Sequence, residues 1–232
     1  MKKLMKAVAA LMLMTAAVYP AESMNAQTHK GHAYVDLGLP SGTLWATCNV
    51  GANNPWEYGN YYAWGETKTK KTYDWNTYKY AKGDYAKLTK YCKQSDYGNN
   101  GFEDKLTTLQ SSDDAATANW GSGWCMPTKE QWEELLNCTM VSDWRELNGV
   151  YGMLFMGYNG NQLFLPAAGF RWGSGLTGAG SCGDYWSRSV STGCYPSGAW
   201  FLCFRSDDCY MTDITDRSGG SSVRPVRSTS KN

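Results

Sequence analysis

The clearest alternation of side-chain character along the chain lies between positions 199 and 205. Two sets of residues alternate there, Trp200, Leu202 and Phe204 with Phe201, Cys203 and Arg205. Because successive side chains of a β-strand point to opposite faces, this pattern predicts a strand with two distinct sides. We expect the set that begins with Trp200 to face the core and the set that begins with Phe201 to face outward.

Other segments have the residue types of short strands and are bounded by Gly, Pro, Ser and Asp. They cover residues 33–39, 43–50, 163–168, 185–190 and 222–226. The stretch from 51 to 100 is rich in Trp and Tyr, is punctuated by glycine and lacks helical periodicity. It therefore predicts long structured loops with few strands.

One helix has clear start signals. Thr128 follows a proline and can cap the helix with its hydroxyl group, and Gln131 three residues later completes a capping box. Trp132, Leu135 and Leu136 then share one face of the helix. This spacing predicts an amphipathic helix that packs on the core.

A shorter helix is expected over residues 113–119, with acidic residues at its start and Gly121 at its end. Two short helices among strands and loops predict an α+β fold with small antiparallel sheets. The predicted core contains Trp132, Leu135, Leu136, Trp186, Trp200, Leu202 and Phe204.

The first 26 residues have the layout of a cleavable signal peptide. Three lysines precede an apolar stretch from Ala7 to Val18, and small residues follow it. That stretch is shorter than the roughly 20 residues that a membrane-spanning helix needs. The first cysteine is Cys48, so no cysteine is placed for a lipid anchor. We expect cleavage after Ser23 or Ala26 and a secreted, non-lipidated protein without membrane insertion.

The remaining chain is expected to divide into a polar leader over 27–33, one domain over 34–227 and a polar tail over 228–232. The sequence carries 22 Lys and Arg against 21 Asp and Glu. This near-neutral balance lacks the excess of positive charge that is typical of nucleic-acid-binding proteins. The eight cysteines include no Cys-x-x-Cys pair, and their spacing leaves open whether they form two to four disulfides or are partly unpaired.

The chain has few residues of the types that common enzyme active sites use. His29 and His32 are the only histidines and fall in the leader, which disfavours a catalytic triad, a Cys-His pair or a His-bearing metal site in the domain. Four acidic residues near the C-terminus have the right chemistry for calcium, but a solvated acidic loop is the favoured interpretation; these are Asp207, Asp208, Asp213 and Asp216. We expect no catalytic residues, no cofactor and no metal.

Six ordered segments of the chain carry a family resemblance. They are VDLGLPSGTLWATCNVGA (35–52), YAWGE (62–66), MPTKEQWEELL (126–136), FLPAAG (164–169), YWS (185–187) and SVRPV (222–226). Together they resemble the Fibrobacter succinogenes major paralogous domain of secreted Bacteroidetes proteins. The resemblance implies a C-type-lectin-like fold, which is shared with the variable proteins of diversity-generating retroelements and with formylglycine-generating enzymes.

The region 172–218 resembles the diversified part of such variable proteins, although ordinary divergence between paralogues remains the alternative. The resemblance implies a ligand-binding face over residues 176–216. Its candidate site residues are Asp184, Arg188, Tyr195, Ser197, Phe201, Cys203, Arg205, Asp207, Asp208, Tyr210 and Asp213. Tyr and Arg dominate the hot spots of protein interfaces. We therefore expect hot spots among Tyr195, Phe201, Arg205 and Tyr210.

The expected function is non-catalytic recognition of a cell-surface protein, a phage or a glycan. The alternative is a structural or adhesive surface component without a diversified site. A hydrolase with two acidic catalytic groups is a third interpretation, but no pair of acids stands out in the sequence. Cys203 and Cys209 are the nearest match to the cysteine pair of formylglycine-generating enzymes. The simpler alternatives are a surface role or a disulfide between them that holds down the 206–218 loop.

Overall fold

The computed structural model describes residues 27–191, 193, 195–212 and 215–228. The signal peptide expected over residues 1–26, the candidate site residue Asp213 and most of the expected polar tail lie outside these residues. The described chain consists mostly of β-sheets with two α-helices, as the α+β prediction requires. Neither helix of the described residues has the length and apolar character needed to cross a bilayer.

Three sheets form the framework. The first has the order β1-β2-β3-β14, and its strands are β1 Gln27–His29, β2 His32–Asp36, β3 Thr43–Ala46 and β14 Val226–Ser228. The residues expected as a polar leader thus form β1 and the start of β2.

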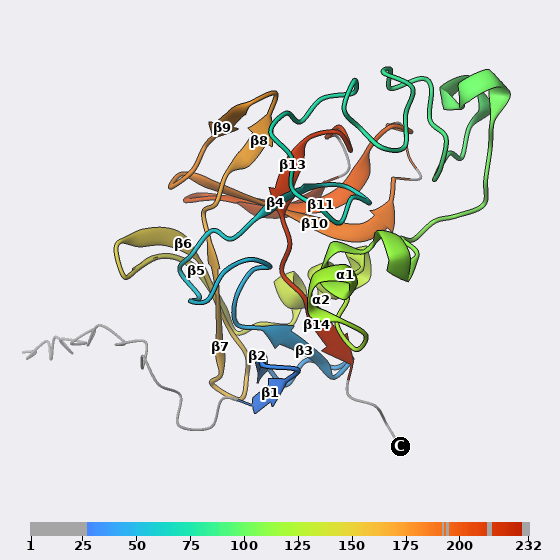
Figure 1. Cartoon of the computed structure of the whole chain (residues 1–232). Helices are drawn as coiled ribbons and strands as arrows, with labels where there is room; N and C mark the ends of the chain where they lie inside the picture. The colour runs from blue at the N-terminus through green and yellow to red at the C-terminus, as the bar shows by residue number, and fades with distance from the viewer. Residues whose placement is uncertain (1–26, 192, 194, 213–214, 229–232) are drawn as a thin grey trace, which may run out of the picture.

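A smaller sheet, the third, is an antiparallel meander of β5 Val141–Leu147, β6 Val150–Met156 and β7 Gln162–Pro166. Figure 1 shows the β5–β6 hairpin projecting from one side of the molecule.

The second and largest sheet has seven strands in the order β12-β11-β10-β13-β8-β9, and β4 pairs with β13. Its strands are β4 Tyr61–Ala63, β8 Phe170–Trp172, β9 Gly175–Thr177, β10 Cys182–Val190, β11 Ala199–Arg205, β12 Cys209–Thr212 and β13 Gly220–Ser222. The predicted strand over 199–205 matches β11. The segment 222–226 does not form one strand, because the chain leaves the large sheet after Ser222 and enters the first sheet at Val226.

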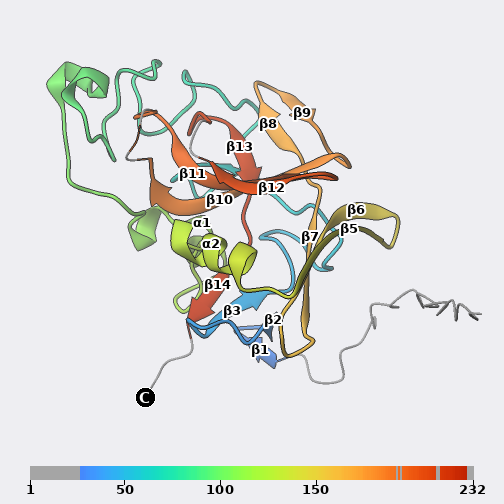
Figure 2. The same cartoon turned by 180° about the vertical axis from the view of Figure 1, so that it is seen from behind.

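The helices lie between the large sheet and the first sheet in both views (Figures 1 and 2). They are α1 Ala115–Trp120 and α2 Lys129–Asn137. In α2 the hydroxyl of Thr128 accepts from the N–H of Gln131 at 3.2 Å, and the Gln131 side chain accepts from the N–H of Thr128 at 2.9 Å. The predicted capping box is therefore confirmed. Asp114 caps α1 by accepting from the N–H of Thr117 at 3.0 Å, and Gly121 ends the helix with φ of 86°.

The chain between β4 and α1 is almost free of regular strands and helices, as predicted for the aromatic loops. Its short 3-10 turns are Ser95–Tyr97, Asn99–Gly101 and Ser111–Asp113. These loops cover one face of the large sheet and contribute Trp64, Tyr78 and Tyr91 to a buried cluster. The other face of the sheet packs on α2 and the first sheet through Trp45, Trp132 and other residues of a second cluster.

Both faces of β11 are consequently covered at Phe201 and Leu202, and this overturns one prediction about facing. Phe201 is only 6% exposed and packs on Trp186 in the loop-covered cluster, with ring centroids 5.8 Å apart. Trp200 is only partly buried, and the Lys129 ammonium lies 4.0 Å from the centroid of its ring. The expectation that Phe201 faces solvent was wrong because alternation distinguishes two faces but cannot tell that loops cover the second one.

Five of the other six predicted core residues are buried. Trp132, Leu135, Trp186, Leu202 and Phe204 are buried, whereas Leu136 at the edge of α2 is only partly buried.

A buried arginine ties the segment 222–226 to the rest of the fold. The Arg224 guanidinium is fully buried and donates to the Asn49 side chain at 2.8 Å and to the carbonyl of Phe164 at 3.1 Å. It also reaches the carbonyl of Thr47 at 2.7 Å. These bonds join Arg224 to residues between 60 and 177 positions away, so this arginine links three separate segments of the chain.

Candidate functional site

Several predicted site residues meet on one face of the large sheet. The pairing of β10 with β11 sets Asp184 opposite Cys203, and the pairing of β11 with β12 sets Cys203 opposite Tyr210. Residues two apart on a strand share a face, which adds further side chains. We call this set the β10–β12 face; it comprises Cys182, Asp184, Phe201, Cys203, Arg205 and Tyr210.

Exposure varies strongly across the β10–β12 face. Phe201 is buried at its inner end, Asp184 and Cys203 are partly buried, and Tyr210 is 45% exposed at its outer edge. Arg205 is exposed and forms no ion pair among the described residues. One end of the β10–β12 face is therefore part of the core, and the other end is open to solvent.

The turn that joins β11 to β12 extends the open end of this face. Asp207 and Asp208 are both exposed there, and the Asp208 carboxylate accepts from the N–H of Cys209 at 2.8 Å. Arg205 at the end of β11 is paired with Cys182 at the start of β10, so the turn and the face belong to one surface.

The other predicted site residues lie at the opposite end of the β10–β11 pair. Arg188 donates to the carbonyl of Leu109 at 2.7 Å, and its Nε lies 3.9 Å from the Asp114 carboxylate. It therefore ties the loop region to α1. Tyr195 donates to the Asp216 carboxylate at 2.6 Å, and Ser197 is only 2% exposed.

The two ends of this strand pair are well separated. The eight residue steps from one end of β10 to the other span roughly 25 Å at the usual rise of a strand. The structure thus brings together Asp184, Cys203, Arg205 and Tyr210 with the acidic turn, and it separates Arg188, Tyr195 and Ser197 from them.

Electrostatics distinguish the partly buried groups of the face from ordinary surface groups. Burial raises the pKa of Asp184 to about 6, although its interaction with Cys203 and the charge of Arg205 act in the other direction. Burial and the nearby Asp184 charge raise the pKa of Cys203 to about 12. Because the nucleophilic form of cysteine is the thiolate, Cys203 is a protonated, weakly reactive thiol at neutral pH.

The suggested pairing of Cys203 with Cys209 is not compatible with this sheet. Cys209 pairs with Phe204, the neighbour of Cys203, so the two cysteines point to opposite faces. Cys203 packs on the loop-covered cluster, whereas Cys209 packs on the cluster around α2. All seven described cysteines are free thiols, and Cys194 lies outside the described residues.

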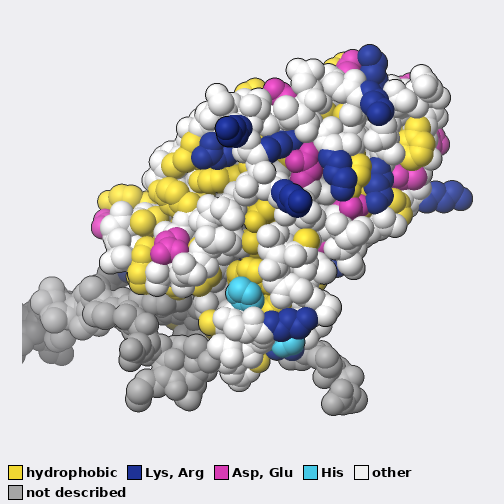
Figure 3. Space-filling model, viewed as in Figure 1, with side chains coloured by type: hydrophobic (Ala, Val, Ile, Leu, Met, Phe, Trp, Pro, Cys, Tyr) yellow, Lys and Arg dark blue, Asp and Glu magenta, His cyan; other side chains and the backbone are white. Residues whose placement is uncertain are grey.

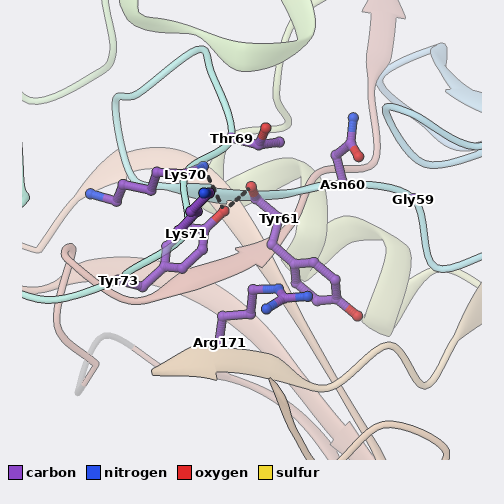
Figure 4. Close-up of a pocket in the computed structure, with 8 residues that line it drawn as sticks. All are labelled: Gly59, Asn60, Tyr61, Thr69, Lys70, Lys71, Tyr73 and Arg171. Atoms are coloured by element: carbon purple, nitrogen blue, oxygen red, sulfur yellow. Dashed lines mark hydrogen bonds between the residues drawn. The ribbon is translucent and has the colours of Figure 1, made fainter. Parts of the chain in front are cut away.

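A pocket that the sequence did not predict lies beside the β10–β12 face. It has a volume of about 410 Å³ and is lined by Gly59, Asn60, Tyr61, Thr69, Lys70, Lys71, Tyr73 and Arg171. Figure 4 shows Arg171 on β8 with its guanidinium beside the ring of Tyr61; the guanidinium carbon is 5.2 Å from the ring centroid. Burial raises the pKa of Tyr61 to about 12, and the charge of Arg171 acts in the opposite direction. Tyr61 belongs to the buried cluster on which Cys203 packs, so the pocket adjoins the β10–β12 face.

Sequence reasoning missed this pocket because Arg171 lies about 100 positions from the other lining residues, which fall within 59–73, and because the net charge of the chain is close to zero. A local signal was nevertheless present. Between positions 66 and 93 the chain carries eight lysines and only three acidic residues. Figure 3 shows Lys and Arg side chains gathered over the upper part of the molecule, where these loops lie.

Neither the histidines nor the acidic residues build a metal site in the described part of the chain, where no group of three or more potential ligands lies together. His32 instead stacks on Trp120 with ring centroids 3.7 Å apart. The Asp216 carboxylate receives both Tyr195 and the indole N–H of Trp75, the latter at 3.2 Å. Asp216 therefore holds two loops together.

Comparison of the chain with protein-family models, with curated proteins and with solved structures finds no match.

Proposed function

We propose that the protein is a secreted, non-catalytic binding protein that recognises its ligand through the β10–β12 face and the adjoining acidic turn. The observation that carries this proposal is the contrast across β11. Phe201 is buried in the core. On the same face, Cys203 is partly buried, and Arg205 and Tyr210 are exposed. These exposed groups stand on a rigid sheet, which is an arrangement that suits recognition.

The composition of this surface supports binding of a macromolecule. A tyrosine, an arginine and acidic groups lie together at the open end of the sheet; they are Asp184, Arg205, Asp207, Asp208 and Tyr210. Tyr and Arg supply most of the energy at the centres of interfaces. Partners of the expected kind are a cell-surface protein, a phage or a glycan.

The proposal includes a C-type-lectin-like scaffold and diversification of region 172–218 by a retroelement. Both rest on the sequence resemblance. The proposed diversified region includes β11 and β12 and therefore the exposed part of the β10–β12 face. Neighbouring DNA that encodes a reverse transcriptase and a template repeat matching codons 172–218 would support diversification. Its absence from the complete locus would favour ordinary divergence.

The binding proposal is tested by screening the purified protein against arrays of glycans and intact bacterial surfaces. The double variant Arg205→Ala/Tyr210→Ala is expected to lose the binding that the unmodified protein shows. The matched control is Tyr158→Ala, because Tyr158 is 75% exposed but lies in the β6–β7 connection, away from the face. Retention of binding by a folded double variant would move recognition to another surface.

One observation favours the alternative of a structural or adhesive component. The third sheet and its flanking turns expose large apolar side chains, since Met140 is 50%, Tyr151 45% and Tyr158 75% exposed. Large exposed apolar side chains on one sheet are candidate contacts for a second molecule. Sedimentation of the protein over a range of concentrations tests this: self-association that Tyr151→Ser and Tyr158→Ser abolish would support the alternative, and a monomer at all concentrations would oppose it.

A further inference from the structure

The pocket beside β8 contains two cationic groups that have no ion-pair partner among the described residues. Lys70 is paired with Glu66, with its ammonium 3.0 Å from the carboxylate. Arg171 and Lys71, in contrast, form no hydrogen bond or ion pair through their side chains among the described residues. A guanidinium and an ammonium that face one pocket without a carboxylate partner favour an anionic ligand.

The walls of this pocket are held in place before any ligand arrives. Tyr73 and Gly173 exchange two backbone hydrogen bonds of 2.8 and 2.9 Å, which tether the lysine-bearing loop to the end of β8. The Tyr73 hydroxyl donates to the carbonyl of Tyr61 at 2.7 Å. Because these bonds use backbone groups and the Tyr73 hydroxyl, the charged groups of Arg171 and Lys71 are left for a ligand.

The ring of Tyr61 supports Arg171 from one side. A guanidinium that stacks on an aromatic face keeps its N–H groups directed outward along its edge. Such a planar edge matches the two oxygens of a carboxylate with parallel hydrogen bonds. Arg171 is thus positioned as a carboxylate receptor, and Lys71 adds a second positive charge.

The rest of the lining suits the neutral part of a sugar. Asn60 and Thr69 are both exposed at the pocket and offer an amide and a hydroxyl group. The volume of about 410 Å³ lies within the range of 300–1,000 Å³ that is usual for small-ligand sites. The lysine-rich loops around the pocket continue the positive surface, so a polymer with repeated acidic groups gains contacts beyond one sugar unit.

We infer that this pocket binds a carboxylate-bearing sugar unit, as found in an acidic polysaccharide, with Arg171 and Lys71 on the carboxylate and Asn60 and Thr69 near the hydroxyl groups. This site goes beyond the recognition proposed for the β10–β12 face and does not depend on it. The two surfaces adjoin at Tyr61, so a long ligand could contact both, but the acidic sugar is assigned to the pocket alone.

Titration calorimetry with defined oligomers of galacturonic acid at physiological ionic strength tests the site. The unmodified protein is expected to bind the free acid and not its methyl ester, which has the same ring and no charge. Arg171→Gln is expected to weaken binding by about 10- to 100-fold, because a hydrogen bond to a charged group is lost. The matched control Lys87→Met removes one charge from the same loop region outside the pocket and is expected to change affinity less than about twofold.

Three outcomes would overturn the inference. The first is an absence of binding by the unmodified protein, and the second is an equal loss in Lys87→Met and Arg171→Gln, which would mean diffuse attraction to a polyanion. The third is tighter binding of a sulfated polysaccharide, inorganic phosphate or single-stranded DNA than of the uronic acid oligomer. Thermal unfolding of each variant shows whether Arg171→Gln keeps the fold, and Lys71→Met provides a second test that leaves the Arg171–Tyr61 contact in place. Loss of β10–β12 binding in Arg205→Ala/Tyr210→Ala with retained uronic acid binding would separate the two sites.

Discussion

Asp113 and Asp184 are two carboxylates that the fold removes from water in different ways. Asp113 accepts from Tyr80 at 2.5 Å, from Lys90 at 2.5 Å and from Tyr91 at 2.7 Å. Burial alone would raise its pKa, but these donors outweigh burial and lower it to about 2. Asp184 is also shielded, and the hydrogen bond to Cys203 and the charge of Arg205 do not offset burial, so its pKa rises to about 6.

The difference separates a structural carboxylate from one that has spare capacity. Every oxygen of Asp113 is used to hold the aromatic loops against α1. Asp184 is left with poorly compensated charge at the edge of an exposed surface, and perturbed groups of this kind gather at functional sites. A ligand that donates hydrogen bonds to Asp184 would supply the compensation that the protein itself lacks.

Phe201 lies where the buried part of the β10–β12 face meets its exposed part. Its removal should have the largest effect on stability. Phe201→Ala is expected to destabilise the protein by about 3–5 kcal/mol, because a buried aromatic ring that packs on Trp186 is lost. Tyr210→Ala on the same face should cost less than about 1 kcal/mol, since Tyr210 is 45% exposed. Urea titrations measure both; equal losses would mean that the open surface is as tightly packed as the core.

Asp113→Asn should have the next largest effect. It is expected to cost about 2–3 kcal/mol, because the variant removes the charge that pairs with Lys90 while the two tyrosine hydroxyls keep one acceptor. Asp208→Asn is the control, since Asp208 is exposed and should change stability by less than about 0.5 kcal/mol. A cost below that of the control would show that Asp113 is not the structural anchor of the loops.

The same carboxylate should make stability depend on acid. The pKa of Asp113 is lowered from 3.8 to about 2 in the folded protein, so the unfolded chain binds the proton first as pH falls. Stability from this group is fully present above about pH 4 and is lost as pH falls towards 2, for a total of about 2 kcal/mol. The difference in unfolding free energy between the unmodified protein and Asp113→Asn, measured from pH 5 to pH 2, should shrink by this amount. A constant difference would contradict the lowered pKa.

Local signals in the sequence predicted the elements better than their burial. Thr128 and Gln131 determine where α2 begins, and the alternation over 199–205 gives the bounds of β11, because both signals depend on neighbours within a few residues. The burial of Phe201 depends on loops that come from positions 100 residues away. No pattern within β11 itself contains that information.

The candidate site shows the same limit. The grouping of Asp184, Cys203 and Tyr210 follows from strand pairing, and the sequence did not indicate which residues of the predicted region would meet. Arg188 and Tyr195 looked like surface groups, yet they are bound to Leu109 and Asp216 within the fold. A side chain with a long, flexible polar end gives no local sign of whether its partner is the protein or a ligand.

The smallest expected effect on stability comes from Asp184, and its pH dependence has the opposite sign to that of Asp113. For Asp184 the folded pKa is raised from 3.8 to about 6, so between these values the folded protein holds a proton that the unfolded chain has released. Stability therefore falls as pH rises through this window, and the charged Asp184 weakens the fold above about pH 6.

Asp184→Asn should then stabilise the protein at pH 8 by about 1–2 kcal/mol, a value reduced from the full shift because the group is only partly buried. The gain should disappear below about pH 4, where the carboxyl is protonated in both states, and the matched control Asp207→Asn should show no such pH dependence because Asp207 is exposed. Urea unfolding at several pH values measures all three proteins. If Asp184→Asn were instead less stable at pH 8, the carboxylate would have partners within the fold, as Asp113 has, and its place at a ligand-binding surface would lose its physical basis. If the gain is found and the same variant also weakens ligand binding, the charge that costs stability is retained for recognition, which is the trade-off expected of a binding site.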